Sequence, residues 1–418
     1  MIKFLSFFAI SVFCSIQISL GEIVNVELGG PLGWRFDPDE DLNTPQIIRR
    51  HGYPAESHIV ETEDGYLLTV HRIPGSRDGN RGGQPILLQH GLLSSSADWV
   101  DEGNASLAFL LADDGYDVWL GNARGNHYSI GHTKLSTDSK EFWDFSWHEM
   151  GVYDLPAVIR FISKTTGKGG DILYVGHSMG TTMFFVFSSL KPEIAKLVKF
   201  MVALAPVAYM KHVRSPIRYL TPFVNEEQWI AEHLGIKEFL PSSKLLHFFT
   251  YECQIIDTGR ICDNIVFILC GADKEEYNED IMPIVLPHIP AGSSTKAVLH
   301  YGQEIKNNGN FQEYDYGMEG NLAHYGTETP PFYNLTHIKV PIYLMYAAND
   351  YMTGPIDVVR LSKQLKNLVG MYLIPLKSFN HIDFLVGKRA PEAVYKPLTK
   401  ILGNFSSSFN EDISVKLV

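Results

Sequence analysis

The clearest pattern along the chain is a series of short apolar runs, each followed by a glycine-containing turn and then by a more amphipathic stretch. Short apolar runs of this kind predict buried β-strands, and their alternation with helical stretches is typical of a mostly parallel sheet. The alternation occupies residues 44–205 and returns over residues 336–402. We therefore expect an α/β protein whose central, mostly parallel sheet is flanked by helices and is interrupted by a long insertion.

The insertion, residues 206–335, lacks the alternation and consists of helical and loop segments rich in aromatic side chains. We expect it to form a cap with a lid over the strand ends. Some of its apolar side chains would line a tunnel or become exposed when the lid moves, and the alternative is that they are ordinary core of the cap. Two dense apolar clusters stand out, formed by Phe239, Leu240, Leu245, Leu246, Phe248 and Phe249 and by residues 265–269.

The first twenty residues differ in composition from the rest of the chain. Lys3 is their only charged residue, and residues 4–20 are almost all apolar or small. This composition predicts a secretory signal peptide over residues 1–20, with an uncleaved anchor as the alternative. No later segment approaches about 18 uninterrupted apolar residues, so no transmembrane span is expected after the signal is removed. Residues 403–418 form a C-terminal tail in this interpretation.

A G-x-S-x-G pentapeptide at residues 176–180 follows directly on the apolar run at residues 171–175. This arrangement predicts a nucleophile elbow, a sharp strand-to-helix turn that lifts the hydroxyl of Ser178 above the sheet. Gly176 and Gly180 would be required because a side chain at either position would collide with neighbouring elements. The pentapeptide also occurs by chance, so the other members of a catalytic triad decide its meaning.

Two later strand-like runs end in the remaining residues of a serine hydrolase triad. Asp350 lies in the turn after the run at residues 340–346, and His381 lies in the loop after the run at residues 370–375. We expect His381 to move the proton of the serine and Asp350 to orient the imidazole. Asp383 is the rival carboxylate, but its position two residues from the histidine makes it less suited to reach the correct ring nitrogen.

The negative charge that develops in such a reaction needs two backbone N–H donors. Met179, directly after the serine, is expected to supply one of them. The other should come from the loop after the apolar run at residues 85–89, which continues as His90-Gly91-Leu92. Because glycine permits a close backbone approach, Leu92 is the expected second donor.

Composition and charge agree with a folded enzyme. At 418 residues, with 45% hydrophobic and 20% charged residues, the chain can bury a large core. The formal net charge of −12 argues against nucleic acid as a partner. No Cys-x-x-Cys motif or clustered histidine spacing predicts a metal site, and the triad chemistry requires no cofactor. The sequence does not indicate an oligomeric state.

An exported chain can carry glycans and disulfides. Glycosylation sequons begin at Asn104, Asn334 and Asn404. Removal of the signal would leave three cysteines, and their spacing alone does not choose among the three possible pairings. These cysteines are Cys253, Cys262 and Cys270.

Taken together, these motifs resemble those of the acid lipase family, the group that contains gastric lipase and lysosomal acid lipase. The oxyanion-loop segment Leu88-Gln89-His90-Gly91-Leu92-Leu93 and the elbow at residues 174–180 are similar to the family's signatures. One departure is Met179, where the gastric and lysosomal members usually carry Gln; its backbone N–H is unaffected by the change. The other similar stretches are residues 46–74, 121–126, 141–143, 205–208, 330–334 and 380–384.

The resemblance implies the α/β-hydrolase fold with an inserted cap, and ester hydrolysis at a lipid–water interface through an acyl-enzyme. It also implies a disulfide between Cys253 and Cys262, with Cys270 left free. We therefore expect a secreted or lysosomal serine lipase, with triacylglycerol as the first substrate and cholesteryl ester as the second. A carboxylesterase for smaller esters is one alternative. A non-catalytic lipid carrier on a lipase fold is another, although such a carrier is expected to lose a triad residue and none is lost here.

Overall fold

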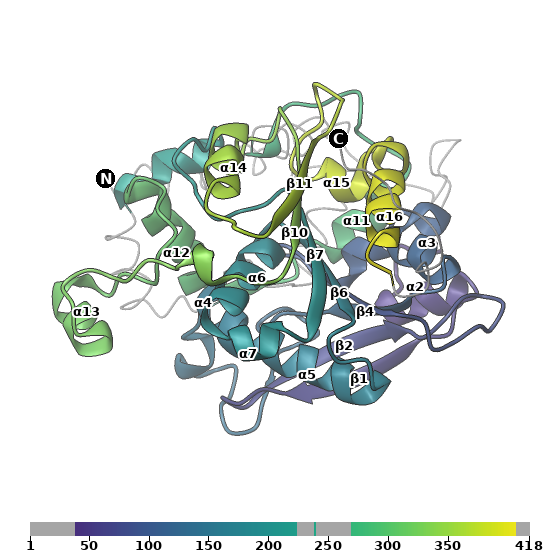
Figure 1. The fold of residues 1–418 in the computed structure, drawn as a ribbon, viewed down its shortest axis with the longest axis horizontal. Coiled ribbons are helices and arrows are strands. Elements are labelled where there is room, and N and C mark those ends of the chain that lie inside the picture. Colours follow the sequence, from purple (N-terminus) through teal and green to yellow (C-terminus); the bar gives the residue numbers. More distant parts are fainter. Residues whose placement is uncertain (1–37, 224–237, 240–268, 407–418) are drawn as a thin grey trace, which may run out of the picture. The chain divides into compact units, whose positions relative to one another are not determined.

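The computed structural model describes residues 38–223, 238–239 and 269–406. Its centre is a nine-stranded sheet with the order β1-β2-β4-β3-β6-β7-β10-β11, in which β5 pairs with β2 (Figure 1). β1 and β2 pair antiparallel, β2 pairs antiparallel with β4, and every pair from β4 to β11 is parallel. The strands of the sheet are β1 (Glu56–Glu61), β2 (Tyr66–Ile73), β3 (Pro85–Gln89), β4 (Asp117–Gly121), β5 (Gly131–His132), β6 (Ile172–His177), β7 (Val198–Leu204), β10 (Ile342–Tyr346) and β11 (Leu368–Leu373).

Helices cover both faces of the sheet, so the core has two layers. In β3, the side chain of Leu87 packs with residues of α5, α6 and α14, whereas Ile86 and Leu88 pack with residues of α2, α3 and α16. This alternation follows from the two-residue period of a strand. Helix α6 is apolar on nearly every side, and residues 179–189 are all buried, as expected for a helix inside the core. The longer helices are α2 (Thr44–Arg50), α3 (Leu107–Asp113), α5 (Leu155–Thr166), α6 (Met179–Leu190), α12 (Thr295–Lys306), α13 (Gly317–Tyr325), α14 (Pro355–Ser362) and α16 (Lys396–Gly403).

Short helical segments complete the fold. They are η1 (Ser96–Trp99), η2 (Gly103–Ala105), η3 (Glu141–Trp143), α4 (Trp147–Glu149), η4 (Met150–Asp154), α7 (Pro192–Ala195), η5 (Pro216–Phe223), α11 (Met282–Val285), η6 (Leu286–His288), η7 (Leu335–His337), α15 (Asp383–Val386) and η8 (Pro391–Tyr395). Most of them lie in connections that lead into or out of the sheet. The connections around the sheet thus contain short helical turns.

The expected class of fold is confirmed, and the strand assignments agree to within about two residues. The apolar runs at 85–89, 171–175, 340–346 and 370–375 correspond to β3, β6, β10 and β11. Because β3, β6, β10 and β11 run parallel, the loops after them all lie at one edge of the sheet. The sequence therefore brings the expected triad residues to a common edge before any side-chain contact is considered.

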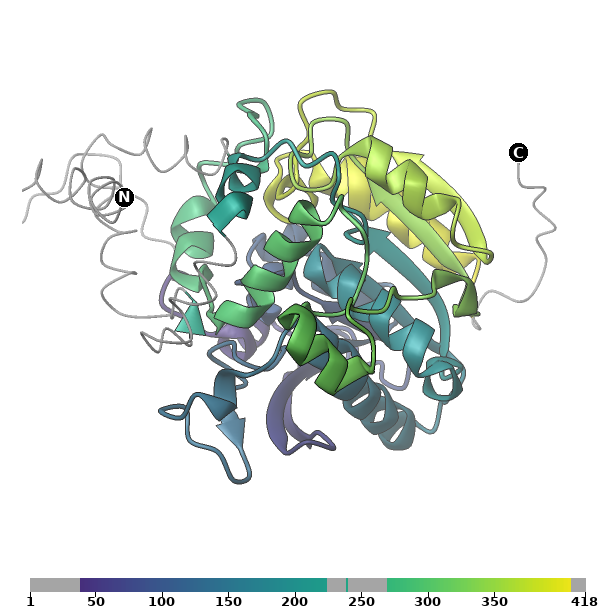
Figure 2. The ribbon, with the colours of Figure 1, turned by 90° about the vertical axis from the view of Figure 1, so that its left-hand side faces the viewer.

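The insertion separates β7 from β10 in the chain, and its described part is mostly helix and loop, as expected. Figure 2 shows α12 and α13 of this region turned toward the viewer. An antiparallel pair of two-residue strands, β8 (Glu238–Phe239) and β9 (Ser293–Ser294), was not expected, because strands this short show no periodicity. Residues 1–20, Phe248 and Phe249 lie outside the described residues. Within the described ranges, no helix is long and apolar enough to cross a membrane.

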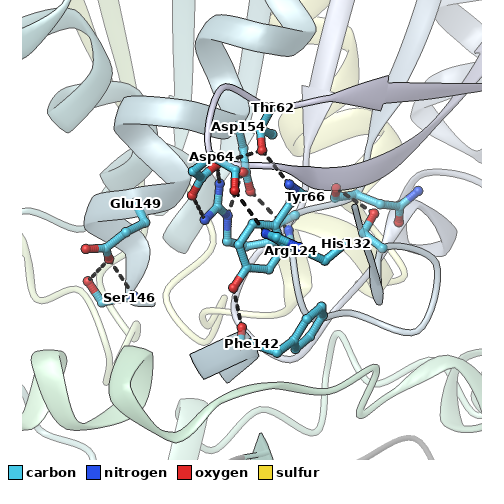
Figure 3. Close-up of polar contacts among 12 residues, drawn as sticks. Thr62, Asp64, Tyr66, Arg124, His132, Phe142, Ser146, Glu149 and Asp154 are labelled. Carbon is cyan, nitrogen blue, oxygen red and sulfur yellow. Dashed lines mark hydrogen bonds and ion pairs between the residues drawn. The ribbon is translucent and has the colours of Figure 1, made fainter. Parts of the chain in front are cut away.

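A buried guanidinium ties the edge hairpin to the rest of the sheet (Figure 3). Arg124, in the loop after β4, donates through Nη1 and Nη2 to Asp64 at 2.5 and 2.8 Å and through Nε to Asp154 at 2.7 Å. Its guanidinium also lies 3.9 Å from the ring centroid of Tyr66. Asp64 belongs to the β1–β2 turn and Asp154 to η4, so one side chain joins three distant segments. Arg124 is 1% exposed.

Replacing Arg124 with Met should lower the free energy of unfolding by about 3–5 kcal/mol, since Asp154 would remain buried without its cation. Urea unfolding followed by circular dichroism measures this loss. The matched control is Arg77→Met, which removes an exposed ion pair to Asp113 and should leave the unfolding midpoint almost unchanged. Equal effects of the two changes would show that the Arg124 network contributes nothing beyond a surface ion pair.

Candidate active site

The turn between β6 and α6 holds Ser178 in a backbone conformation that few non-glycine residues adopt, with φ of 51° and ψ of −118°. Two glycines permit it. A Cβ at Gly176 would lie 2.8 Å from the carbonyl carbon of Gly180, and a Cβ at Gly180 would overlap the carbonyl oxygen of Gln89 in β3. The serine is thereby lifted above the carboxyl edge of the sheet, where its side chain stays partly exposed.

Three side chains from separate loops meet at this turn. His381 Nε2 lies 2.8 Å from Ser178 Oγ, and His381 Nδ1 lies 2.8 Å from Asp350 Oδ2. Asp350 is fully buried and His381 is 6% exposed. Among the described residues, Ser178 is thus the more exposed end of this chain of contacts, and Asp350 is the buried end.

The residues after Asp350 fix its carboxylate. The backbone N–H groups of Met352 and Thr353 donate to Oδ1 at 2.8 and 2.7 Å, and the Thr353 hydroxyl donates to Oδ2 at 2.6 Å. Because an ionised carboxylate only accepts hydrogen bonds, Nδ1 of His381 carries the proton that faces Asp350. Nε2 then presents its lone pair to Ser178, which is the tautomer that can remove the serine proton.

Asp383, the rival carboxylate, makes a different set of contacts. Its Oδ2 accepts the backbone N–H of Asn380 at 2.5 Å, and its side chain is 3% exposed. Burial, reinforced by the nearby Asp273, raises the pKa of Asp383 to about 9. Asp383 is therefore neutral at pH 7, and a neutral carboxyl group stabilises an imidazolium less than a carboxylate does. The geometry favours Asp350 over Asp383 as the partner of His381.

The loop after β3 lies directly against the elbow, since a Cβ at Gly91 would be 3.1 Å from the Cβ of Ser178. His90 fixes this loop. The Ala123 N–H donates to His90 Nε2 at 3.0 Å, so the ring proton is on Nδ1, which donates to the Gly91 carbonyl at 2.7 Å. That carbonyl and the Leu92 N–H belong to one planar peptide unit, so His90 sets the direction of the Leu92 N–H.

The two expected oxyanion donors thus flank Ser178. Leu92 follows the glycine that touches the serine, and Met179 is the first residue of α6. An N–H in the first turn of a helix has no acceptor within that helix and lies at its positive end. Both groups are available in principle to a negatively charged oxygen beside Ser178.

His177 is a further residue of the site, and the sequence analysis did not identify it. Its Nε2–H donates to the backbone carbonyl of His381 at 2.9 Å, which ties the histidine loop to the elbow. Burial, reinforced by the nearby His381, lowers the pKa of His177 to about 3, so the ring stays neutral. The sequence does not mark this role, because His177 occupies a variable position of G-x-S-x-G and its partner is 204 residues away in the chain.

The other predicted residues are the cysteines and the asparagines of the sequons. Cys270 has no disulfide partner among the described residues, whereas Cys253 and Cys262 lie outside them, so their pairing stays a prediction. No group of three or more potential metal ligands is found in the part of the chain that the structure describes. The asparagines of all three sequons are exposed, namely Asn104, Asn334 and Asn404.

Comparison with known proteins yields two matching family models and several close relatives. The partial alpha/beta-hydrolase lipase region matches residues 44–103, and the alpha/beta hydrolase fold matches residues 84–387. Lipase 1 of Drosophila melanogaster is 41% identical over 90% of this chain and 82% of its own length. Gastric triacylglycerol lipase of Homo sapiens is 41% identical over 87% of this chain and 92% of its own. Lysosomal acid lipase/cholesteryl ester hydrolase of Homo sapiens is 40% identical over 88% of this chain and 92% of its own length.

Replacing His90 with Leu should slow the labelling of Ser178 by a fluorophosphonate probe by about tenfold or more, since loss of an oxyanion donor costs about 10²–10³ and a misdirected one somewhat less. The second-order rate constant of labelling is the measured quantity. His71→Leu is the matched control, because His71 is also a buried imidazole whose pKa burial lowers to about 4, and it contacts Ser57 instead. Wild-type labelling rates in both variants would mean that His90 does not position the loop.

Proposed function

The chain belongs to the acid lipase family of α/β-hydrolases, and from that premise we propose that it cleaves the carboxylic ester bonds of neutral lipids with Ser178 as the nucleophile. The observation that supports this assignment most directly is the continuous hydrogen-bonded chain from Ser178 through His381 to Asp350, with 2.8 Å at each step. A base within reach of the hydroxyl and a carboxylate behind the base are the two requirements of an activated serine.

In the proposed reaction, His381 Nε2 takes the proton of Ser178 as the serine oxygen attacks the ester carbonyl. The Leu92 and Met179 N–H groups hold the oxygen that becomes negative, each donor contributing about 3 kcal/mol to the transition state. Asp350 stabilises the imidazolium. His381 then passes the proton to the departing alcohol, which leaves an acyl-enzyme. Water, activated by the same imidazole, releases the fatty acid and restores the serine.

The proposed substrates follow from the relatives. One is named a triacylglycerol lipase and the other a cholesteryl ester hydrolase, so we place triacylglycerol first and cholesteryl ester second, both taken from a lipid–water interface. A carboxylesterase for smaller esters is the runner-up. A non-catalytic lipid carrier is less well supported, because all three triad side chains are present and within hydrogen-bonding distance. The mechanism uses only side chains and backbone groups of this chain, so it needs no cofactor.

The proposed domain organisation is a hydrolase core formed by residues 44–205 and 336–402, with residues 206–335 as a cap. A contact between the two parts supports this division: the Ala291 N–H of the insertion donates to the Leu93 carbonyl in the loop after β3 at 2.7 Å. The insertion thus meets the core beside the proposed oxyanion donor. Residues 403–418 are the proposed tail.

We propose that the protein enters the secretory pathway and is secreted or lysosomal. Support comes from the apolar composition of residues 1–20 and from relatives named gastric and lysosomal lipases. The exposure of Asn104, Asn334 and Asn404 is compatible with glycosylation at any of them. A disulfide between Cys253 and Cys262 belongs to the same proposal.

Ser178→Ala should leave a folded protein with about 10⁶-fold lower kcat toward a soluble ester, since the nucleophile is lost. Asp350→Asn should lower kcat by about 10⁴-fold because the imidazole would adopt the wrong tautomer. The matched control is Asp383→Asn, which should stay within about threefold of the wild type near pH 6 if Asp383 has no direct role. A larger loss for Asp383→Asn than for Asp350→Asn would mean that the wrong carboxylate was chosen.

A lipase that desolvates a long acyl chain gains about 0.8 kcal/mol per buried CH₂, and part of this gain should lower the barrier. We therefore expect kcat/KM to rise from acetyl to octanoyl esters, measured below their critical micelle concentrations. The double change Phe248→Ala and Phe249→Ala should flatten the rise while sparing acetyl esters. Phe332→Ala, at an exposed position of the same insertion, should leave it intact.

Two outcomes would contradict this interpretation of the cap. A wild-type preference for acetyl esters would favour the carboxylesterase alternative. A chain-length preference that survives the double change would place Phe248 and Phe249 in the core of the cap instead of in an acyl tunnel.

A further inference from the structure

Residues 270–276 of the insertion lie between the two loops that carry Asp350 and His381. The carbonyl oxygen of Cys270 accepts the N–H of Tyr351 at 3.1 Å and the N–H of His381 at 3.5 Å. These donors belong to the turn after β10 and to the loop after β11. One carbonyl group of the insertion therefore bridges the two loops whose side chains must meet.

The next two residues repeat this bridge. The Gly271 carbonyl accepts the side-chain amide of Asn380 at 2.8 Å. The side-chain amide of Asn349 donates to the carbonyls of Ala272 at 2.9 Å and Ser378 at 2.6 Å. Gly271 has a φ of 123°, and a Cβ there would overlap the Asn349 carbonyl. The insertion thus passes so close to the acid-bearing turn that only glycine fits.

A pair of buried carboxyl groups closes the same region. Asp273 and Asp383 are 2% and 3% exposed, and the charge of Asp273 acts on Asp383. Asp273 Oδ1 accepts the backbone N–H groups of Glu275 and Glu276 at 2.8 and 3.1 Å, while its buried Oδ2 has no hydrogen-bond donor. Asp383 Oδ2 accepts the N–H of Asn380. Leaving a buried carboxylate oxygen without a donor is costly, and a proton shared with the neighbouring Asp383 would supply that donor.

We propose that residues 270–276 form a brace that positions Asp350 and His381 relative to each other, and that Asp273 and Asp383 close this brace by sharing one proton. The inference rests on the proposed roles of Asp350 and His381 in catalysis. Asp273 and Asp383 are positioning residues, because each acts through the histidine loop and neither touches the reacting atoms.

The surrounding charges decide at which pH the brace opens. Burial first, and then the negative charges of Asp273 and Glu276, raise the pKa of Asp383 to about 9. The pair keeps its proton below that pH and loses it above, where two adjacent carboxylates repel each other and loosen the brace. The titratable groups that interact with the pair are Cys270, Glu276 and Arg389, and Glu275 is ion-paired with Arg389.

None of these neighbours replaces the proton. Arg389, the cation among them, is ion-paired with Glu276 and Glu275. Burial raises the pKa of the Cys270 thiol to about 12, so the thiol stays neutral while Asp383 titrates. We therefore expect the brace to lose the proton shared by Asp273 and Asp383 near pH 9.

The test compares Asp383→Asn with the wild type in kcat for a soluble butyrate ester and in the rate of fluorophosphonate labelling, between about pH 6 and pH 10. Asparagine cannot ionise, yet its amide can donate to Asp273 and its oxygen can accept the Asn380 N–H. We expect both proteins to agree within about twofold near pH 6. Above about pH 9 the wild-type kcat should fall by up to about tenfold per pH unit, and the variant should not show this fall.

Two further variants separate positioning from folding. Asp383→Ala leaves Asp273 Oδ2 and the Asn380 N–H without a partner and should lower kcat about tenfold at every pH, with KM unchanged. Glu304→Gln is the matched control, because Glu304 is a fully buried carboxyl group in α12 whose pKa burial also raises, and it lies outside the brace. It should change the pH dependence of thermal stability but not that of kcat.

An alkaline fall in Asp383→Asn identical to that of the wild type would overturn the shared proton. Wild-type kcat in Asp383→Ala would overturn the brace as a positioning device. If instead Ser178→Ala or Asp350→Asn keeps its activity, the proposed function fails and the brace has no catalytic residues to position. The two failures are therefore distinguishable.

Discussion

The site depends on one close backbone contact, between the first turn of α6 and the end of β3. Gly180 lies so near the Gln89 carbonyl that no Cβ fits between them. This contact fixes where α6 begins, and with it the strained conformation of Ser178. It also brings the loop after β3 against the serine, because that loop starts where the contact is made. Ser178 and one proposed oxyanion donor are therefore positioned by the same packing constraint.

Three imidazoles gather around Ser178, and their surroundings give them different roles. His90 and His177 are buried without a carboxylate partner, and burial lowers their pKa values to about 4 and 3. They remain neutral and donate single hydrogen bonds to carbonyl groups, which makes them rigid supports. His381 alone has a carboxylate at Nδ1 and a hydroxyl at Nε2. Asp350, held by three donors, thus selects which imidazole can carry charge.

Backbone groups of the insertion contact the loops that carry the proposed site residues. Its backbone contacts Leu93 in the loop after β3 and bridges the loops of Asp350 and His381 through residues 270–272. Arg124 performs a comparable task in the loop after β4, where it joins the β1–β2 turn to η4. In both places a few polar contacts join segments that are distant in the chain.

The sequence by itself determined the class of fold and the identity of the three residues that meet at the β6–α6 turn. Three features can be recognised without knowledge of distant contacts. They are the strand periodicity, the glycine spacing of the elbow, and the order of serine, aspartate and histidine along the chain. Parallel strands then bring the loops after them to one edge, so the convergence of Ser178, Asp350 and His381 was predictable from the order of elements.

Only the tertiary structure decided which buried groups support these three residues. The roles of His90, His177 and Asp273 depend on partners that are distant in the chain, and no short motif marks such a pairing. The charge state of Asp383 likewise follows from burial beside a second carboxylate, which sequence spacing does not reveal. Local patterns predict elements and their order, whereas the packing between elements determines where protons lie and how the loops are held.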